Sequence, residues 1–285
     1  MKKNIILLFV IFSCLCVSAQ VTHEISIQGG IGYSTLNYKP LKGKHAGGCG
    51  GELGFGYTCI FKEQWGFHVG ITPAYYSASA KLDGETMVTP NLMDNERDLF
   101  DMHTSFIKFK ETQHALYLNI PFMAQFQTKT TYPIYVRAGL KVGIPLYGSS
   151  KTKNGSFSNA GFYHKTEVLL ETQEFAGFGN YENRNAKSKL SFKPTVMLAF
   201  EVGTQWNKES KHPIYTGVYF DYGLTNIAKK NNENEKFINY DPVDAPNFTT
   251  NSALPFIANK IHNMAVGIKI GIIIHTSRNV ATDIE

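Results

Sequence analysis

The chain has 285 residues, of which 43% are hydrophobic and 18% charged, and its formal net charge is +5 at pH 7. Without the two lysines of a predicted export signal the charge falls to about +3, which is too mild for a nucleic-acid-binding surface, so we expect no nucleic-acid partner. After residue 20 there is no run of about 18 apolar residues, which excludes a transmembrane helix in the rest of the chain.

The first 19 residues have the features of a secretory signal peptide. Two lysines form the charged start, and an apolar run of about 13 residues, 5–17, follows them. Val17-Ser18-Ala19 then places small residues where signal peptidase needs them. We therefore expect residues 1–19 to be a signal peptide and residues 20–285 to form one outer-membrane β-barrel domain. The alternatives are an N-terminal anchor helix and a lipoprotein attached through Cys14, although the sequence before this cysteine is a poor lipobox.

Alternation of apolar and other residues with a period of two is the main signal in the mature chain. It is clearest from Leu116 to Gln127, where every second residue is apolar. The same period predicts about eight strands, each long enough to cross a bilayer when tilted. In chain order they are His23–Tyr38, Gly48–Phe61, Trp65–Ser77, Leu116–Gln127, Ile134–Tyr147, Leu190–Gly203, His212–Ile227 and Met264–His275.

The connections between these strands alternate in length. Three are short polar turns and three are long, with one moderate connection; they cover 62–64, 128–131 and 207–211, then 81–113, 149–189 and 228–259, and finally 39–46. Short periplasmic turns and long extracellular loops are typical of outer-membrane barrels. The sequence therefore predicts an all-β fold, a transmembrane antiparallel up-and-down β-barrel of about eight strands with both termini in the periplasm.

The chemistry of the two faces of each strand indicates which face meets lipid. The apolar rows contain no charged residue, whereas the opposite rows are rich in glycine, as at Gly30, Gly139 and Gly267. Small residues with a few charges suit a cramped lumen better than a water-exposed surface, which favours a membrane barrel over a soluble lipocalin-like barrel. The only two tryptophans, Trp65 and Trp206, flank predicted periplasmic turns, where an interfacial aromatic girdle would place them.

The predicted lumen-facing rows carry balanced charges. Four acids and four bases lie on them: Glu24, Glu52, Glu201, Asp221, Arg137, Lys141, Lys193 and Lys269. Side chains fill the lumen of an eight-stranded barrel, and an unpaired charge there is costly, so we expect a plugging network of salt bridges. Arg137 and Glu201 lie on neighbouring strands at similar heights above their turns, and Lys141 or Lys193 is the alternative partner of Glu201. A gated ion path and catalytic carboxylates are the functional alternatives.

The lumen network has one further pairing to place. Asp221 lies near the middle of its strand, within reach of Lys141 or Lys269.

No catalytic, cofactor or metal motif is recognisable. The nine histidines are scattered, and none lies in a nucleophile motif. Only His68 with Glu52 merits testing as a pair, and a buried histidine bonded to a carboxylate is the simpler interpretation. Cys49 and Cys59, if on one strand, would stand roughly 33 Å apart and could not bond to each other. We expect no enzyme activity, no cofactor and no metal site.

Four short motifs link the chain to a known group of barrels. They are Ser18-Ala19-Gln20, Trp65-Gly66-Phe67-His68-Val69-Gly70-Ile71, Tyr117-Leu118-Asn119-Ile120-Pro121 and Asp221-Tyr222-Gly223-Leu224. With these motifs the mature chain resembles the PorT-like outer-membrane β-barrel family of Gram-negative bacteria. The resemblance implies location in the outer membrane, contact with its lipid and insertion by the barrel-assembly machinery, and it marks a fold rather than an activity. The tail 277–285 departs from outer-membrane proteins that end on an aromatic residue, which leaves the insertion signal open.

The expected function is a structural role or binding through the loops, without catalysis. Polar and aromatic loops on a rigid barrel are a common way to bind an extracellular ligand or protein. Two alternatives stay open, a narrow outer-membrane pore and a lipid-acting enzyme embedded in the membrane.

Overall fold

A computed structural model describes residues 21–208, 210, 212–229 and 235–277; the predicted signal peptide lies outside these residues. Eight antiparallel strands form a closed ring in the order β10-β11-β14-β1-β2-β3-β6-β7, and a β10–β7 ladder completes it. Their bounds are β1 (Val21–Asn37), β2 (Lys44–Phe61), β3 (Trp65–Lys81), β6 (Lys110–Gln127), β7 (Ile134–Tyr163), β10 (Thr195–Trp206), β11 (Ile214–Gly223) and β14 (His262–Ser277). The predicted transmembrane up-and-down barrel is confirmed.

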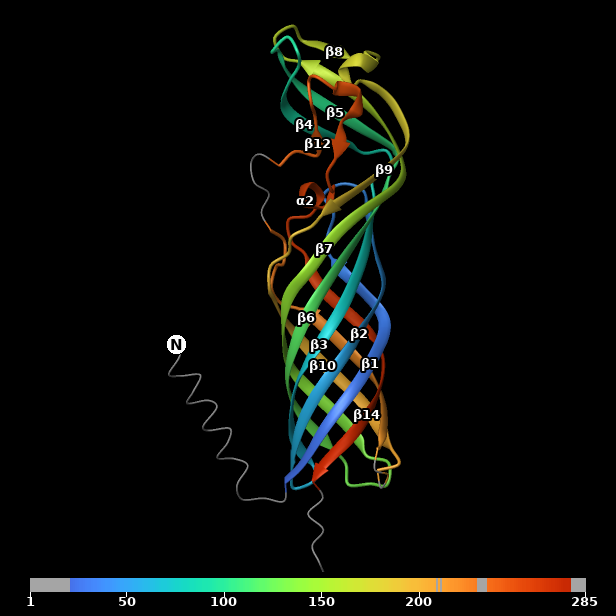
Figure 1. Cartoon of the computed structure of the whole chain (residues 1–285), viewed down its shortest axis with the longest axis vertical. Coiled ribbons are helices and arrows are strands. Elements are labelled where there is room, and N and C mark those ends of the chain that lie inside the picture. The colour runs from blue at the N-terminus through green and yellow to red at the C-terminus, as the bar shows by residue number, and fades with distance from the viewer. Residues whose placement is uncertain (1–20, 209, 211, 230–234, 278–285) are drawn as a thin grey trace, which may run out of the picture.

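The two ends of the ring differ as predicted. Short connections join β2 to β3 and β6 to β7, and β1 begins and β14 ends at this same end (Figure 1). The long connections all lie at the opposite, extracellular end. Within the described part of the chain, no helix is both long enough and apolar enough to pass through a membrane.

The long connections form a structured unit above the ring, which we call the head (Figure 1). Its elements are β4 (Thr86–Met93), β5 (Leu99–Lys108), β8 (Val168–Leu170), η1 (Glu174–Ala176), β9 (Gly179–Lys189), β12 (Ile238–Asn239), η2 (Ala245–Asn247), β13 (Thr249–Thr250) and α2 (Leu254–Ile257). β7 is 30 residues long and continues from the barrel wall into the head, where it pairs with β5, β8 and β9. The alternation in the sequence predicted only the first half of this strand, Ile134–Tyr147.

The interior of the molecule is polar in the ring and apolar in the head. In the ring, large apolar side chains point outward, as at Leu53 and Ile268, while polar ones such as Gln28 are buried inside. In the head the arrangement is inverted, and aromatic side chains such as Phe100 and Phe157 are buried in a core. The reason is the solvent outside, because apolar side chains turn toward lipid around the ring and away from water in the head.

Aromatic side chains mark both edges of the outward apolar band. Trp65 and Trp206 lie exposed beside the short turns; Trp65 packs on Phe126 at 4.9 Å between ring centroids. At the other edge Tyr75 and Tyr147 point outward, although the sequence analysis did not single them out. Trp65 and Tyr75 are ten residues apart on β3, a height of about 25 Å for a tilted strand and the expected thickness of the apolar band.

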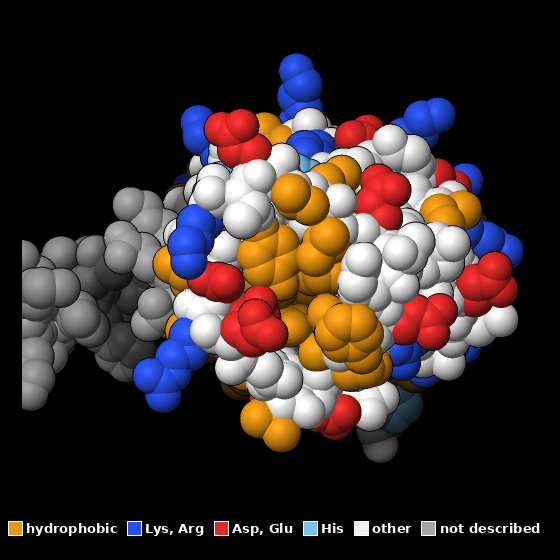
Figure 2. All heavy atoms as spheres, turned by 90° about the horizontal axis from the view of Figure 1, so that it is seen from above, with side chains coloured by type: hydrophobic (Ala, Val, Ile, Leu, Met, Phe, Trp, Pro, Cys, Tyr) orange, Lys and Arg blue, Asp and Glu red, His pale blue; other side chains and the backbone are white. Residues whose placement is uncertain are grey.

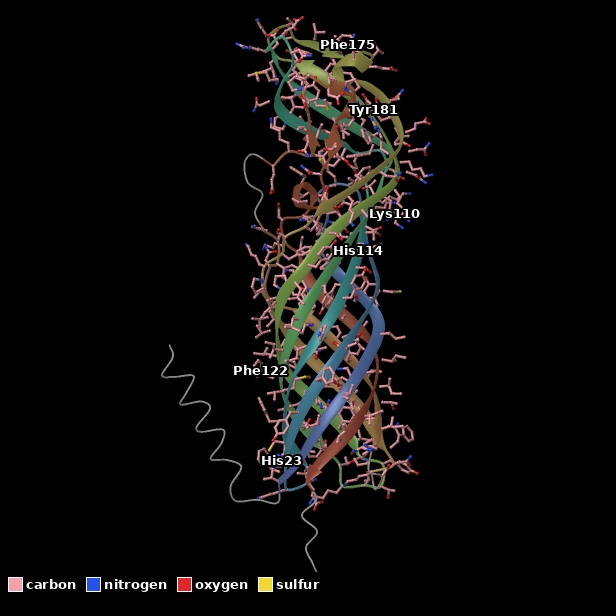
Figure 3. All side chains as sticks on the ribbon, in the orientation of Figure 1. His23, Lys110, His114, Phe122, Phe175 and Tyr181 are labelled. Carbon is pink, nitrogen blue, oxygen red and sulfur yellow. The ribbon has the colours of Figure 1, made fainter. Side chains whose placement is uncertain are left out.

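The side chains drawn in Figure 3 follow this division. Phe122 points outward from the ring, whereas His114 and Lys110 lie at the junction with the head, and Phe175 lies at the tip. Residues of β6 before His114 therefore belong to the head side of the molecule.

The ring closes where β1 meets β14, and this seam needs small residues. Gly32 and Gly267 face each other in the register. A Cβ on Gly32 would lie 2.2 Å from the carbonyl oxygen of Val266, and one on Gly267 would lie 2.3 Å from that of Ile31. Any side chain at either position would push the two strands apart.

One predicted strand is corrected by the structure. β10 begins at Thr195, not at Leu190, because Pro194 has no N–H for the ladder and marks the strand boundary. Leu190 is buried in the core of the head instead of facing lipid, and Phe192 packs against the same core.

Candidate functional site

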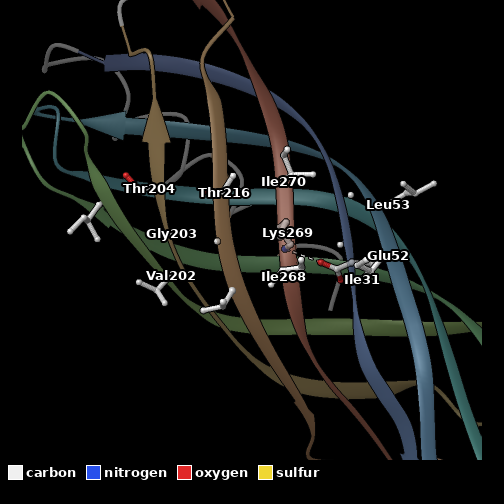
Figure 4. Close-up of a pocket in the computed structure, with 15 residues that line it drawn as sticks. Ile31, Glu52, Leu53, Val202, Gly203, Thr204, Thr216, Ile268, Lys269 and Ile270 are labelled. Carbon is white, nitrogen blue, oxygen red and sulfur yellow. Dashed lines mark ion pairs between the residues drawn. The ribbon is translucent and has the colours of Figure 1, made fainter.

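Six buried charged side chains form one continuous chain of ion pairs across the lumen. In order they are Arg137, Glu201, Lys269, Glu52, Lys141 and Asp221, and we call them the ion-pair chain. Arg137 Nη1 lies 3.2 Å from Glu201 Oε1. Lys269 Nζ lies 2.8 Å from both Glu201 Oε2 and Glu52 Oε1. Figure 4 shows the pair of Lys269 on β14 and Glu52 on β2.

The second half of the ion-pair chain is centred on Lys141. Its Nζ lies 2.7 Å from Asp221 Oδ2 and 3.4 Å from Glu52 Oε2. Cation and anion thus alternate at every step, three of each, and all six side chains are at most 4% exposed. Such a neutral, paired arrangement avoids the cost of an uncompensated buried charge, which is about 3–5 kcal/mol.

Neutral polar side chains extend the network toward the short turns. Tyr135 donates a hydrogen bond to Glu201 Oε1 at 2.9 Å, and Arg137 Nε donates to Gln125 Oε1 at 2.6 Å. Gln125 Nε2 in turn donates to Gln127 Oε1 at 3.0 Å. These contacts fix the rotamers of both members of the first ion pair.

Tyrosine rings lie against the three cations. Lys269 Nζ is 5.1 Å from the centroid of the Tyr219 ring, and Lys141 Nζ is 5.8 Å from the same ring. Arg137 lies 4.9 Å from the ring of Tyr135 and 5.6 Å from that of Tyr215. Cation–π attraction adds to the ion pairs at these distances.

A second layer fills the lumen on the head side of the ion-pair chain. Tyr76 and Tyr117 meet edge to face at 5.9 Å, and both are buried. Asn119 Nδ2 donates to Tyr76 OH at 3.2 Å, and Tyr76 OH lies 3.7 Å from the sulfur of Met197. We call this second layer the tyrosine layer. Side chains thus fill the lumen at two levels, the ion-pair chain and the tyrosine layer.

The wall outside the Lys269–Glu52 pair is hollowed by a shallow groove. Its volume is about 930 Å³, and Ile31, Leu53, Ile268 and Ile270 line it (Figure 4). Glu52 and Lys269 also belong to the lining of this groove, although their side chains are each only 2% exposed.

Two of the eight charged residues expected in the lumen are not among the six that define the ion-pair chain. The expectation for Lys193 is corrected: it is exposed and precedes β10, because the strand begins only after Pro194. Its carbonyl oxygen accepts a hydrogen bond from Tyr117 OH at 3.1 Å. Glu24 is buried on β1, as its parity indicated, but is not a member of the ion-pair chain.

The structure pairs His68 and Glu52 with other residues and not with each other. His68 Nδ1 is hydrogen-bonded to Thr58 Oγ1 at 2.9 Å, while Glu52 is bonded to two lysines. Cys49 and Cys59 both lie on β2, and within the described residues neither forms a disulfide bond. Within the described ranges, no group of three or more His, Cys, Asp or Glu side chains is arranged to hold a metal ion.

Several tyrosines of the site were missed by the sequence analysis. Tyr135 and Tyr219 share strand parity with the charged residues two positions away, Arg137 and Asp221. That shared parity was the signal that would have placed both rings in the lumen.

The chain matches a family model and has weak likenesses to solved structures. Residues 18–229 match a family model described as "Outer membrane protein beta-barrel domain". Among solved structures, the chain is similar to Ail of Yersinia pestis in complex with the heparin analogue sucrose octasulfate, at 11% identity and a TM-score of 0.31, covering 88% of this chain and 98% of that one. It is also similar to the outer membrane protein OprG from Pseudomonas aeruginosa, at 13% identity and a TM-score of 0.37, covering 90% and 98%.

At TM-scores this low, neither likeness bears on function. No curated protein matches the chain significantly. The family model covers well over half of the chain, and its description names the membrane in which such barrels reside. The chain therefore belongs to the outer membrane protein β-barrel domain family and is a protein of the cell outer membrane.

Proposed function

We propose that this protein is a closed outer-membrane barrel that holds a rigid binding head on the cell surface, without catalysis. The observation that carries the proposal is the continuity of β7, which pairs with β6 and β10 in the ring and with β5 and β9 in the head. A head built on a continuous strand keeps one orientation relative to the membrane. Loops on rigid scaffolds commonly serve binding.

The head also has its own tertiary anchors. Phe106, Phe157 and Phe237 are among the aromatic residues of its core. Glu111 on β6 accepts hydrogen bonds from Ser252 Oγ and from the Ala253 N–H, both at 2.8 Å, and so ties the connection between β11 and β14 to the barrel. A surface ordered before binding loses less entropy on binding.

Trypsin treatment of intact cells tests the rigidity of the head. Lys151 on β7 and Lys187 on β9 are exposed but are register partners within a ladder. We expect cleavage at both to be slow, because a protease needs an extended, unpaired segment. Rapid cleavage at either lysine would contradict the rigid head.

The ion-pair chain and the tyrosine layer support a lumen closed to ions. A passing ion would have to displace side chains that are paired with one another and fill a narrow ring. Planar-bilayer recordings test this point, and we expect no single-channel openings from the purified wild-type protein. Steady openings would overturn the closed lumen.

A narrow pore is the second candidate, favoured by a few buried polar atoms. Among the described residues, Asn119 Oδ1, Asp221 Oδ1 and the side-chain amide of Asn263 are buried without a hydrogen-bond partner. Atoms of this kind usually bind water, and a row of waters is the beginning of a polar path. The same bilayer recordings decide between the two candidates.

A further inference from the structure

A pocket at the tip of the head combines an apolar floor with an acidic rim. Its volume is about 580 Å³, and it lies between the β4–β5 turn, the β7–β8 turn, η1 and η2. Viewed from above, hydrophobic side chains gather in a central hollow with acidic side chains around it (Figure 2). The volume is typical of small-ligand and peptide-side-chain sites.

The charge around this pocket is opposite to that of the chain. The three segments that build the tip, 94–98, 163–176 and 240–246, contain eight Asp or Glu and two Lys or Arg, whereas the whole chain has a net charge of +5. The residues that line the pocket include Asp94, Glu96 and Asp98 and no lysine or arginine. The tip therefore attracts cations, and more strongly at low salt.

The carboxylates at the rim have different roles. Asp94 shapes the turn, because its Oδ1 accepts the N–H groups of Glu96 and Asp98, both at 2.9 Å, and its Oδ2 accepts the hydroxyl of Tyr163 at 3.0 Å. Glu96 is exposed at the rim. Asp98 lies 3.4 Å from Lys165, an exposed pair that a ligand cation can replace at little cost. Glu96 and Asp98 are thus the carboxylates open to a ligand.

The apolar part of the pocket is fixed on one side and open on the other. Phe100 stacks on Tyr163 at 5.3 Å and meets Tyr240 edge to face at 5.2 Å, so both walls are held by the core of the head. Phe175 is 80% exposed, and Val168 is also exposed. Large apolar side chains left in water and rimmed by polar groups are typical of a binding site.

We propose that this pocket binds an amphipathic cationic peptide, with an arginine or lysine at Glu96 and Asp98 and a neighbouring apolar side chain against Phe175 and Val168. The acidic residues that line the pocket lie together in the segment 94–98, beside an open apolar hollow, which suits a ligand with a cationic and an apolar part better than a compact ion. Aromatic walls add cation–π attraction. The inference rests on the proposed binding role of the head and names its ligand class.

Fluorescence anisotropy on the full chain in lipid nanodiscs tests the inference. The probe is a labelled peptide of alternating arginine and leucine, and we expect it to bind with an affinity that falls as salt rises. The Glu96→Gln, Asp98→Asn double variant should weaken binding about tenfold or more. Phe175→Ser should weaken binding at high salt as well as low. Glu182→Gln, an exposed charge change on β9 outside the pocket, should leave the affinity unchanged.

The outcomes separate this inference from the proposed function. Equal binding of a matched peptide of glutamate and leucine, or no effect of both pocket variants, would overturn the cationic ligand while leaving the head as a binding unit. No binding of the arginine–leucine peptide to the wild type would overturn the inference too. Trypsin resistance of each variant shows that its head is folded, and together with the bilayer recordings on the wild type it tests the proposed function independently.

Discussion

Arg137 and Glu201 are paired both in the backbone ladder and through their side chains. They stand directly opposite each other in the β7–β10 ladder, and their side chains form an ion pair of 3.2 Å inside the lumen. The backbone ladder therefore holds both Cα atoms at the distance that the side-chain pair requires, and Gln125 and Tyr135 hold the side chains themselves. Further charged residues extend the pair into a longer chain. Glu201 therefore has two cationic partners, Arg137 and Lys269, whereas Arg137 is ion-paired with Glu201 alone in that chain.

The first prediction is that removing Glu201 destabilises the barrel more than removing Arg137. Glu201→Gln removes the one carboxylate shared by Arg137 and Lys269 and should destabilise the barrel by about 3–5 kcal/mol. Arg137→Met should cost less, because Glu201 keeps Lys269 and Tyr135. The double variant restores equal numbers of cations and anions and should recover part of the loss. Urea unfolding in lipid vesicles, analysed as a double-mutant cycle, measures each term.

A coupling energy near zero in this cycle would contradict the pairing. A larger loss for Arg137→Met than for Glu201→Gln would contradict the role of Glu201 as the shared carboxylate.

The second prediction concerns the solvent around the sheet. Leu198 on β10 and Val88 on β4 have similar exposure, 50% and 45%. Leu198→Arg should destabilise the protein by about 2–4 kcal/mol because this side chain faces the bilayer interior, whereas Val88→Arg in the head should change the stability little. Unfolding titrations in lipid vesicles measure both. Equal effects of the two substitutions would refute the assignment of the lipid-facing band.

Topology gives the third prediction. An epitope tag inserted after Asn95, in the turn between β4 and β5, should bind antibody on intact cells. A tag after Lys129, in the turn between β6 and β7, should bind only after the outer membrane is permeabilised. Labelling in the reverse order would mean that the barrel is inserted the other way round.

The fourth prediction is a pH dependence centred on Glu111, on the head side of β6. Burial raises the pKa of its carboxyl above the usual 4.5, and hydrogen bonds from Gln113, Ser252 and the Ala253 N–H offset part of this effect. The folded protein therefore keeps this proton in a pH range where the unfolded chain has lost it. Stability contributed by Glu111 is present below pH 4.5 and is lost as the pH rises through the folded-state pKa.

Glu111→Gln should remove this term. The free energy of unfolding of the variant, relative to wild type, should rise as the pH increases from 4.5 toward neutrality, because only the wild type loses stability there. Subtracting the two curves cancels the titration of the acids in the lumen. A difference that does not change with pH would show that Glu111 has an ordinary pKa.

Much of the barrel could be predicted from local pattern alone. Alternation from Leu116 to Gln127 predicted most of β6, and the matching heights of Arg137 and Glu201 above their turns predicted their proximity. The partner of Asp221 stayed open between two lysines because it depends on the stagger between strands, which no single strand encodes. The ladders in the structure bring Lys141, not Lys269, to Asp221.

What the sequence determined by itself is the membrane-spanning part of this protein. Lipid on one side and a narrow lumen on the other impose strict alternation on every strand, and that alternation can be read without knowing any contact. Only the tertiary structure decided the fold of the head, where water lies outside and apolar side chains point into a core. Its anchors join residues far apart in the chain, such as Glu111 with Ser252 and Phe100 with Tyr240, and such contacts leave no period in the sequence. The apolar tip pocket with its acidic rim arises in the same way, because three distant segments assemble only when the core of the head brings them together.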